Sequence, residues 1–138
     1  DGTKQAEHFI NAVGEDLSGR LIPAVEVRLR GLYRLLPPDY YEAADNLADF
    51  CDRIEKQYGV RPVIYCTERT YKNIVASDSR FNKDKIWYES LFSKPDKDMD
   101  WTFWTYTNRV KFSFYESGEY LHMTVFNGSE DDFKKLII

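Results

Sequence analysis

Two spacings of apolar residues divide the chain into expected helices and strands. Where apolar residues recur every three or four positions, a helix is predicted. This spacing predicts helices over residues 3–13, 39–58 and 130–137, and a short helix directly after residue 67. The expected N-caps are Thr3, Asp39, Thr67 and Ser129, and Gly14 and Gly59 follow the first two helices as stop signals.

Runs of β-branched and aromatic residues between these helices predict strands. They cover residues 21–31, 61–67, 85–90, 101–106 and 120–126, with an additional hairpin arm over 111–116 that turns at 117–118. Because strands and helices alternate through most of the chain, we expect a mainly parallel sheet. The predicted fold is α/β, with about five mainly parallel strands and flanking helices, in a single domain over residues 1–138.

The first predicted strand, Leu21 to Gly31, ends in charged residues. Successive side chains of a strand point to opposite faces, so Glu26 and Arg28 share one face. Val25 and Val27 share the other. In α/β enzymes the catalytic groups lie at the carboxyl ends of strands, which makes this pair a candidate for chemistry. The alternative is an ion pair with no role beyond satisfying its own charges.

Composition and charge exclude several classes of function. The net charge is −4 and Lys and Arg form no cluster, so we expect no nucleic-acid partner. We find no apolar run long enough to span a bilayer and no signal peptide, so we expect no membrane partner and assign no localisation. Aromatic residues make up 16% of the chain, which suits a carbohydrate-binding cleft as well as a packed core.

The cysteines and histidines predict neither a metal centre nor a cofactor. Cys51 and Cys66 lack the spacing of metal ligands, and His8 and His122 do not complete a site with them. We expect two buried free thiols rather than a disulfide. Cys51 lies on the apolar stripe of the long helix, where a small core residue is the simplest interpretation.

Four segments together resemble the family 25 glycoside hydrolases, which are lysozyme-type muramidases that cut peptidoglycan. They are Val63 to Thr67, Ile86-Trp87, Trp101 to Thr107 and Val125 to Gly128, in the family's order. The family fold is an irregular barrel of eight strands, and this chain resembles its last five. The resemblance therefore implies a partial, half TIM-type β/α barrel. Members of the family are secreted or encoded by phages.

The resemblance also places the family's functional positions on this sequence. Its paired Asp-x-Glu carboxylates, needed on either side of a glycosidic bond, correspond to Glu26 and Arg28. A guanidinium stays charged at ordinary pH, so Arg28 cannot replace a general acid. His122 is the third catalytic position, and could serve as a general base or as a hydrogen-bonded interface residue. The implied substrate-binding positions are Tyr65, Glu89, Trp104, Thr105 and Thr124.

Departures from the family pattern sort by strand face. Strand alternation assigns the altered positions to the face that lines the barrel's mouth: Glu26, Arg28, Thr105, His122 and Thr124. It assigns family-like residues to the helix-covered face: Val25, Val27, Val63, Tyr65, Trp104, Tyr106, Met123 and Val125. This sorting indicates an inner face rebuilt by design or by selection, with the outer packing kept.

Three functions follow as hypotheses. The first is a catalytically inactive scaffold, engineered or diverged, in which the open face and the two edge strands pair in a homodimer or with a complementing half-barrel. That face would carry Glu26, Arg28, Arg30, Glu68, Glu89 and His122. The second is an active muramidase with Glu68 or Glu89 as a new acid, although Glu89 could equally be the salt-bridge partner of Arg28.

The third hypothesis is a glycan-binding module. Its candidate stacking surfaces are Trp87, Tyr88, Trp101 and Trp104, for which filling the core is the competing interpretation.

Overall fold

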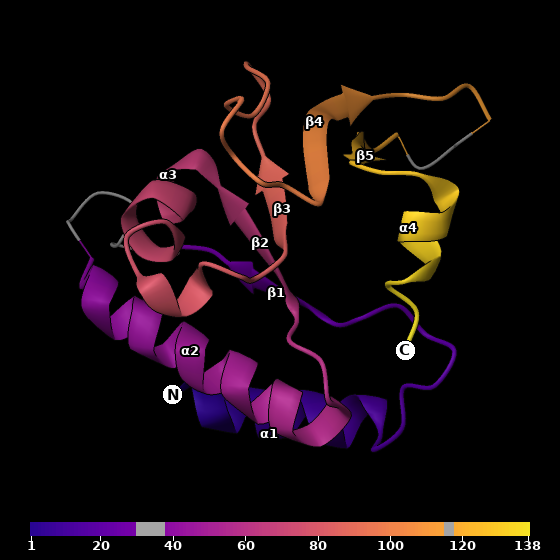
Figure 1. Cartoon of the computed structure of the whole chain (residues 1–138). Coiled ribbons are helices and arrows are strands. Elements are labelled where there is room, and N and C mark those ends of the chain that lie inside the picture. The colour runs from indigo at the N-terminus through magenta and orange to yellow at the C-terminus, as the bar shows by residue number, and fades with distance from the viewer. Residues whose placement is uncertain (30–37, 115–117) are drawn as a thin grey trace.

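The computed structural model describes residues 1–29, 38–114 and 118–138. Five strands form one sheet in the order β1-β2-β3-β4-β5. They are β1 (Ala24–Val27), β2 (Val63–Thr67), β3 (Ile86–Glu89), β4 (Phe103–Val110) and β5 (Leu121–Phe126) (Figure 1). Neighbouring strands from β1 to β4 are parallel, and β5 runs antiparallel to β4. The predicted α/β fold with mainly parallel strands is confirmed, and it is consistent with part of a β/α barrel.

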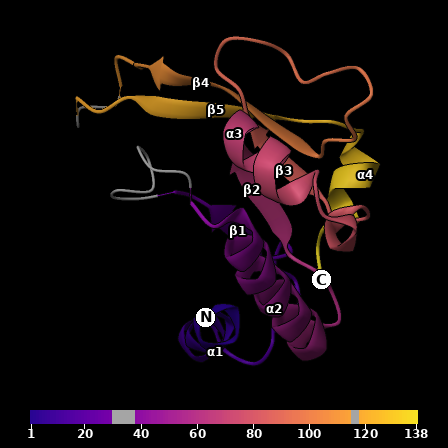
Figure 2. The same ribbon diagram turned by 90° about the vertical axis from the view of Figure 1, so that its left-hand side faces the viewer.

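The helices follow the predicted order. They are α1 (Gly2–Val13), α2 (Tyr40–Tyr58), α3 (Glu68–Thr70), the π-helix η2 (Tyr71–Val75), the 3-10 helix η3 (Ser79–Phe81) and α4 (Glu130–Lys134). Helices α1 and α2 lie side by side on one side of the sheet, with α2 nearer to the strands (Figures 1 and 2). Among the described residues, no helix combines the length and apolarity needed to cross a membrane.

Capping residues explain where the helices begin and end. Asp39 accepts hydrogen bonds from the backbone of Tyr41 and Glu42 at the start of α2, and Gly59, at φ 74°, ends it in the left-handed region. Thr67 and Ser129 cap α3 and α4 as expected.

The start of α1 differs from prediction, because Asp1 rather than Thr3 is the cap. Its carboxylate accepts from the Lys4 backbone N–H at 3.1 Å. Gly2 can then lie directly against α2, where a Cβ would come within 1.8 Å of the Asn46 carbonyl oxygen.

Strand boundaries depart most from the sequence-based expectation. The first strand was expected over residues 21–31, of which residues 30–31 lie outside the described residues. Within the described part, β1 is shorter than expected, because β2 offers register partners only from Val63 to Cys66. The fourth extends to Val110 because its pairing with β5 continues through two register shifts. Residues 111–114 form no strand, and the remainder of the expected hairpin arm, residues 115–117, lies outside the described residues.

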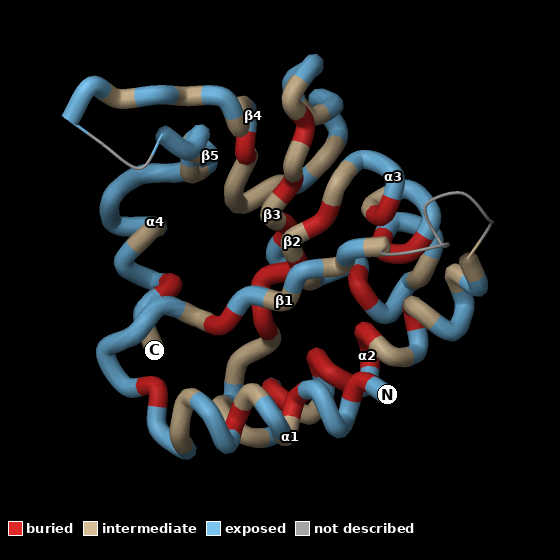
Figure 3. The backbone as a smooth tube through the Cα atoms, turned by 180° about the vertical axis from the view of Figure 1, so that it is seen from behind, coloured by how far each residue is buried: buried red, intermediate tan, exposed pale blue. Residues whose placement is uncertain are grey.

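The main core lies between α2 and the sheet. One face of β2 and β3 packs against the apolar stripe of α2 and against η2 (Figure 3). Its buried members include Leu47, Cys51, Ile64, Cys66 and Ile86. Both cysteines are free and buried, as predicted. A second cluster joins α1 to α2 through Ala6, Ile10, Phe50 and Ile54.

The opposite side of the sheet, here called the inner face, carries a row of aromatic rings. One row of register partners crosses all five strands: Glu26, Tyr65, Trp87, Phe103 and Phe126. Ring centroids are 5.2 Å apart for Tyr65–Trp87 and for Trp87–Phe103, and 5.4 Å for Phe103–Phe126. Phe133 of α4 adds an edge contact at 5.3 Å from Phe126.

The assignment of Val63 and Tyr65 to the helix-covered face was wrong. Both are register partners of inner-face residues, Ala24 and Glu26 respectively. Because β2 is apolar on both sides, its sequence does not reveal which residues face the helices.

Candidate functional site

The inner face is hollowed into a cavity of about 340 Å³, here called the inner-face pocket. Its lining residues come from all five strands and the segment just after β1: Ala24, Glu26, Arg28, Tyr65, Trp87, Thr105, His122 and Thr124. The structure thus brings together the three predicted catalytic positions, Glu26, Arg28 and His122. It also adds three of the predicted substrate-binding positions, Tyr65, Thr105 and Thr124. Their roles stay predictions.

An ion pair occupies the position where the family resemblance implies the catalytic carboxylates. Arg28 Nη2 lies 2.5 Å from Glu26 Oε1, with the two side chains 54% and 39% exposed. Such an exposed pair adds little to stability. The guanidinium supplies donors but no transferable proton, and it engages a carboxylate oxygen of Glu26. The ion pair that the sequence offered as the alternative to chemistry on this strand is therefore present. Of the two carboxylates considered as partners of Arg28, Glu26 on its own strand is the one that pairs with it.

Glu89 has a different partner on the neighbouring strand. The Tyr65 hydroxyl donates a hydrogen bond to Glu89 Oε2. Burial raises the pKa of Tyr65, and the hydrogen bond to the Glu89 carboxylate raises it further. The phenol therefore remains protonated at ordinary pH and acts as a donor.

A second polar network fixes the far side of the pocket. The Trp87 indole Nε1–H donates to Thr105 Oγ1 at 2.8 Å, and the Thr105 and Thr124 hydroxyls are 2.7 Å apart. Thr105 is only 1% exposed, so these bonds are protected from water. They hold the indole edge-on to β4 and leave the Thr124 hydroxyl at the pocket wall. The geometry can bind a polar ligand through hydroxyls beside one aromatic side chain.

Trp104 is set apart from the other predicted site residues. Its side chain packs against the core on the helix side, and its indole Nε1–H donates to the Ser90 carbonyl at 3.0 Å. Tyr88 is buried in the same core, where burial raises its pKa to about 12. Trp101 lies beside Trp104, with ring centroids 6.2 Å apart. Of the four candidate stacking residues, Trp87 alone is among the residues that line the inner-face pocket.

Two further charged residues, Glu68 and Arg30, were predicted for the open face. Glu68 begins α3 rather than ending a strand, and it pairs with Lys72 at 2.6 Å. Arg30 falls outside the described residues. Within the described part of the chain, His, Cys, Asp and Glu form no group of three or more that could hold a metal ion.

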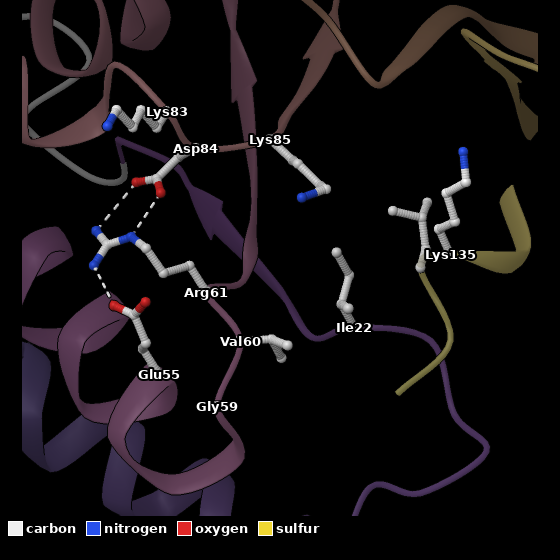
Figure 4. A pocket seen from close by; sticks show the side chains of 10 residues that line it. Ile22, Glu55, Gly59, Val60, Arg61, Lys83, Asp84, Lys85 and Lys135 are labelled. Carbon is white, nitrogen blue, oxygen red and sulfur yellow. Dashed lines mark hydrogen bonds and ion pairs between the residues drawn. The ribbon is translucent and has the colours of Figure 1, made fainter. Parts of the chain in front are cut away.

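A further cavity, of about 290 Å³, lies near the start of β2 and β3 (Figure 4). Arg61 lines this cavity and donates two hydrogen bonds to Asp84, of 2.6 and 3.1 Å. It also donates to Asp52 at 2.6 Å and to Glu55 at 3.1 Å. Asp84 raises the pKa of Arg61 above its already high value. With its donors engaged by three carboxylates, Arg61 connects α2 to the segment before β3, which is a structural role.

Phe92, on the loop between β3 and β4, was not among the candidate site residues predicted from the sequence. Phe92 on this loop is fully exposed and lines another cavity with Thr67 and Glu89. Its sequence, Ser90-Leu91-Phe92-Ser93, resembles the end of an ordinary strand. The signal that could have identified Phe92 is a large apolar residue just past the end of a predicted strand.

Together, the mainly parallel sheet, α1 and α2 on one face and the polar pocket on the other define an α/β fold that is consistent with part of a β/α barrel. The family model for glycosyl hydrolases family 25 matches residues 1–113. The chain therefore belongs to glycosyl hydrolase family 25, as its sequence motifs indicated.

Solved structures of this family share the fold. A family 25 glycosyl hydrolase from Bacillus anthracis is 29% identical with a TM-score of 0.83, and the match covers 100% of this chain and 64% of that one. A bacterial lysozyme from Streptomyces coelicolor is 23% identical with a TM-score of 0.74, covering 99% and 66%. A family GH25 lysozyme from Aspergillus fumigatus is 19% identical with a TM-score of 0.72, also covering 99% and 66%.

These structures show that the chain spans slightly less than two thirds of the length of such relatives. It corresponds to part of a family 25 domain. No curated protein sequence matches the chain.

Proposed function

We propose that this chain binds a glycan of the peptidoglycan type without cleaving it. The single observation that carries the proposal is the ion pair between Arg28 and Glu26. Lysozymes and a muramidase are among the structures that the chain resembles, so a glycan is the expected class of ligand. The fold supports binding, and the altered charges argue against hydrolysis.

Hydrolysis of a glycosidic bond requires two carboxyl groups with different duties. One protonates the leaving oxygen, and the other stabilises or captures the developing cation. Among the described residues that line the inner-face pocket, Glu26 is the only carboxylate, and Arg28 holds it in an ion pair. Glu89, the nearest replacement by strand register, accepts the hydroxyl of Tyr65. Both carboxylates are thus engaged by other side chains, and neither is free to donate a proton to a leaving oxygen.

Binding needs only what the pocket still supplies. Trp87 offers a partly exposed aromatic side chain, and the hydroxyls of Tyr65 and Thr124 lie in the same lining. Sugar rings combine an apolar face with hydroxyl groups around the edge, which suits an aromatic wall flanked by donors and acceptors. Whether selection or design changed the inner face, recognition by these side chains does not require a catalytic acid.

Titration with soluble peptidoglycan fragments tests the proposal through tryptophan fluorescence. We expect a saturable change in emission and no release of new reducing ends. Trp87→Phe should remove most of the fluorescence change, whereas Trp101→Phe, which alters a tryptophan on the other side of the sheet, should keep it. A titration without any saturable change, or one unaffected by Trp87→Phe, would overturn the proposal.

A second candidate function is assembly with another polypeptide. Within the described part of the sheet, β1 and β5 each pair with one strand only, and the inner face carries both an acidic and a basic side chain. Open strand edges and opposite charges suit a self-complementary interface or a chain that supplies further strands. We propose a homodimer as the simplest such assembly.

A further inference from the structure

A second cavity lies beyond the carboxyl ends of β2 and β3. Its volume is about 450 Å³, and it is here called the strand-end pocket. Its lining comes from the end of β2, the start of α3 and the loop after β3, and includes Thr67, Glu89 and Phe92. Neither the ion pair of Arg28 with Glu26 nor the threonine network of the inner-face pocket belongs to it.

The strand-end pocket continues the inner-face pocket. Thr67 and Glu89 are the last register partners of β2 and β3, two residues beyond the pair Tyr65 and Trp87. Residues two apart on a strand share a face, so all four side chains lie on the inner face. Glu89 lines the strand-end pocket and accepts the hydroxyl of Tyr65, which lines the inner-face pocket. One hydrogen-bonded pair is thus the boundary between the two cavities.

Phe92 stands fully exposed at the rim of the strand-end pocket. Leaving such a side chain in water forgoes the favourable free energy of burying its apolar surface. The loop that carries it is nevertheless held in place. Ser90 N–H donates to the Thr105 carbonyl at 3.2 Å, Trp104 Nε1–H donates to the Ser90 carbonyl at 3.0 Å, and the Ser90 and Ser93 hydroxyls are 3.2 Å apart. A held, exposed ring is a ready stacking surface.

Charges around the strand-end pocket balance. Its lining contains two acidic residues, Glu68 and Glu89, and two basic residues, Arg69 and Lys72. Lys72 Nζ is 2.6 Å from Glu68 Oε1. Glu89 accepts the Tyr65 hydroxyl, and Arg69 donates to the Tyr40 hydroxyl at 3.3 Å. A rim with balanced charges that are each engaged by another side chain does not select a strongly charged ligand. An uncharged molecule with one apolar face and many hydroxyls fits both the rim and the ring.

We infer that Phe92 and the strand-end pocket form a second sugar subsite. A linear glycan of uncharged sugars would run from the inner-face pocket past the Tyr65–Glu89 pair and place its next ring against Phe92. This inference rests on the proposed glycan-binding function and adds to it the length of chain recognised and the residue that recognises the extension.

Calorimetric titration with β-1,4-linked N-acetylglucosamine oligomers of two to six units tests the subsite. For the unaltered chain, affinity should rise about tenfold once an oligomer is long enough to reach the second pocket. Phe92→Ala should abolish this rise and leave the affinity for the shortest binding oligomer unchanged. Phe92→Trp should restore it, because the aromatic surface is retained. Phe114→Ala is the matched control, since Phe114 is 80% exposed but lies beyond β4.

The outcomes separate the two proposals. If short oligomers bind but affinity does not grow with length, or grows equally in Phe92→Ala, the second subsite is wrong and glycan binding stands. If no oligomer of any length binds to the folded chain, both proposals are overturned. Circular dichroism of each variant checks that it is folded, as expected for the change of an exposed side chain.

Discussion

Arg28 and Arg61 show how the surroundings of a guanidinium decide its role. Arg28 is half exposed and pairs with a single carboxylate in a pocket. Arg61 is more buried and holds three carboxylates, one of them on Asp84, whose side chain is 2% exposed. The exposed Arg28 pair has little effect on stability, whereas the Arg61 network connects elements of the fold.

Asp84→Asn should therefore lower the free energy of unfolding by about 3 kcal/mol, because it removes a buried partner of Arg61. Asp45→Asn is the matched control, since Asp45 is exposed and pairs with Arg80 at 2.8 Å. It should change stability by less than about 1 kcal/mol. Urea unfolding of both variants measures the difference, and equal effects would show that the Arg61 network is not structural.

The two cysteines should be unreactive in the folded chain. Burial raises the pKa of both Cys51 and Cys66 to about 12, so at pH 8 each is a protonated thiol, and only the thiolate attacks a disulfide reagent. Raising the pH towards 12 increases the thiolate fraction, so any residual reactivity should rise with pH. A dithionitrobenzoate assay at pH 8 should detect no fast thiol in buffer and two in guanidinium. Fast labelling of the native chain would contradict the packing of α2 against the sheet.

At this scale, sequence reasoning found the site residues more readily than their partners. Motif positions identified Glu26, Arg28 and Thr105, which the structure brings together. An ion pair between Glu26 and Arg28 was one of the predicted alternatives and is present. Glu89 was the other possible partner of Arg28, because several carboxylates lie at strand ends and sequence does not rank their distances. Tyr65 was placed on the wrong face because an apolar strand gives no sign of its orientation.

At the scale of helices and strands, the sequence predicted an element's end correctly where a local signal, such as a capping residue, marks it. Caps at Asp39, Thr67 and Ser129 and the stop at Gly59 were all predicted, since a cap acts within one turn of the chain. Strand lengths were not, because a strand extends only as far as its neighbour offers partners. That information belongs to the pair and not to either sequence segment, as β1 and β4 both show.

The packing of α2 predicts a large effect from one truncation. Ile54 is fully buried between α1 and α2, so Ile54→Ala should lower the unfolding free energy by about 3 kcal/mol. Lys56→Ala, two residues further along the same helix and exposed, should change it by less than about 0.5 kcal/mol. Thermal and urea unfolding provide the comparison. A small loss for Ile54→Ala would mean that the contact between α1 and α2 contributes little.

On the scale of the whole molecule, the sheet is open in the described residues. β1 and β5 are its edges (Figure 2). The inner face carries the inner-face pocket. The related structures extend beyond the part that this chain matches. Sequence reasoning anticipated the open edges from the number of strands, but an edge alone does not identify its partner.

If the proposed homodimer forms through the inner face, light scattering at micromolar concentration should give twice the mass of one chain. Arg28→Glu would then place two carboxylates side by side and shift the equilibrium towards the single chain. Lys134→Glu, on the outer surface of α4, is a control that should leave the mass unchanged. A single-chain mass for the unaltered protein at all concentrations up to about 100 μM would exclude this assembly.

Clearing of a suspension of purified bacterial cell walls tests the proposed absence of hydrolysis most directly. Because Arg28 engages Glu26 and, by the family resemblance, stands at the position of an expected acid, we expect the unaltered chain to leave the turbidity constant while an active lysozyme clears the same suspension. Clearing by this chain that disappears in Glu26→Gln would show that Glu26 is catalytically competent beside Arg28, and would contradict the account.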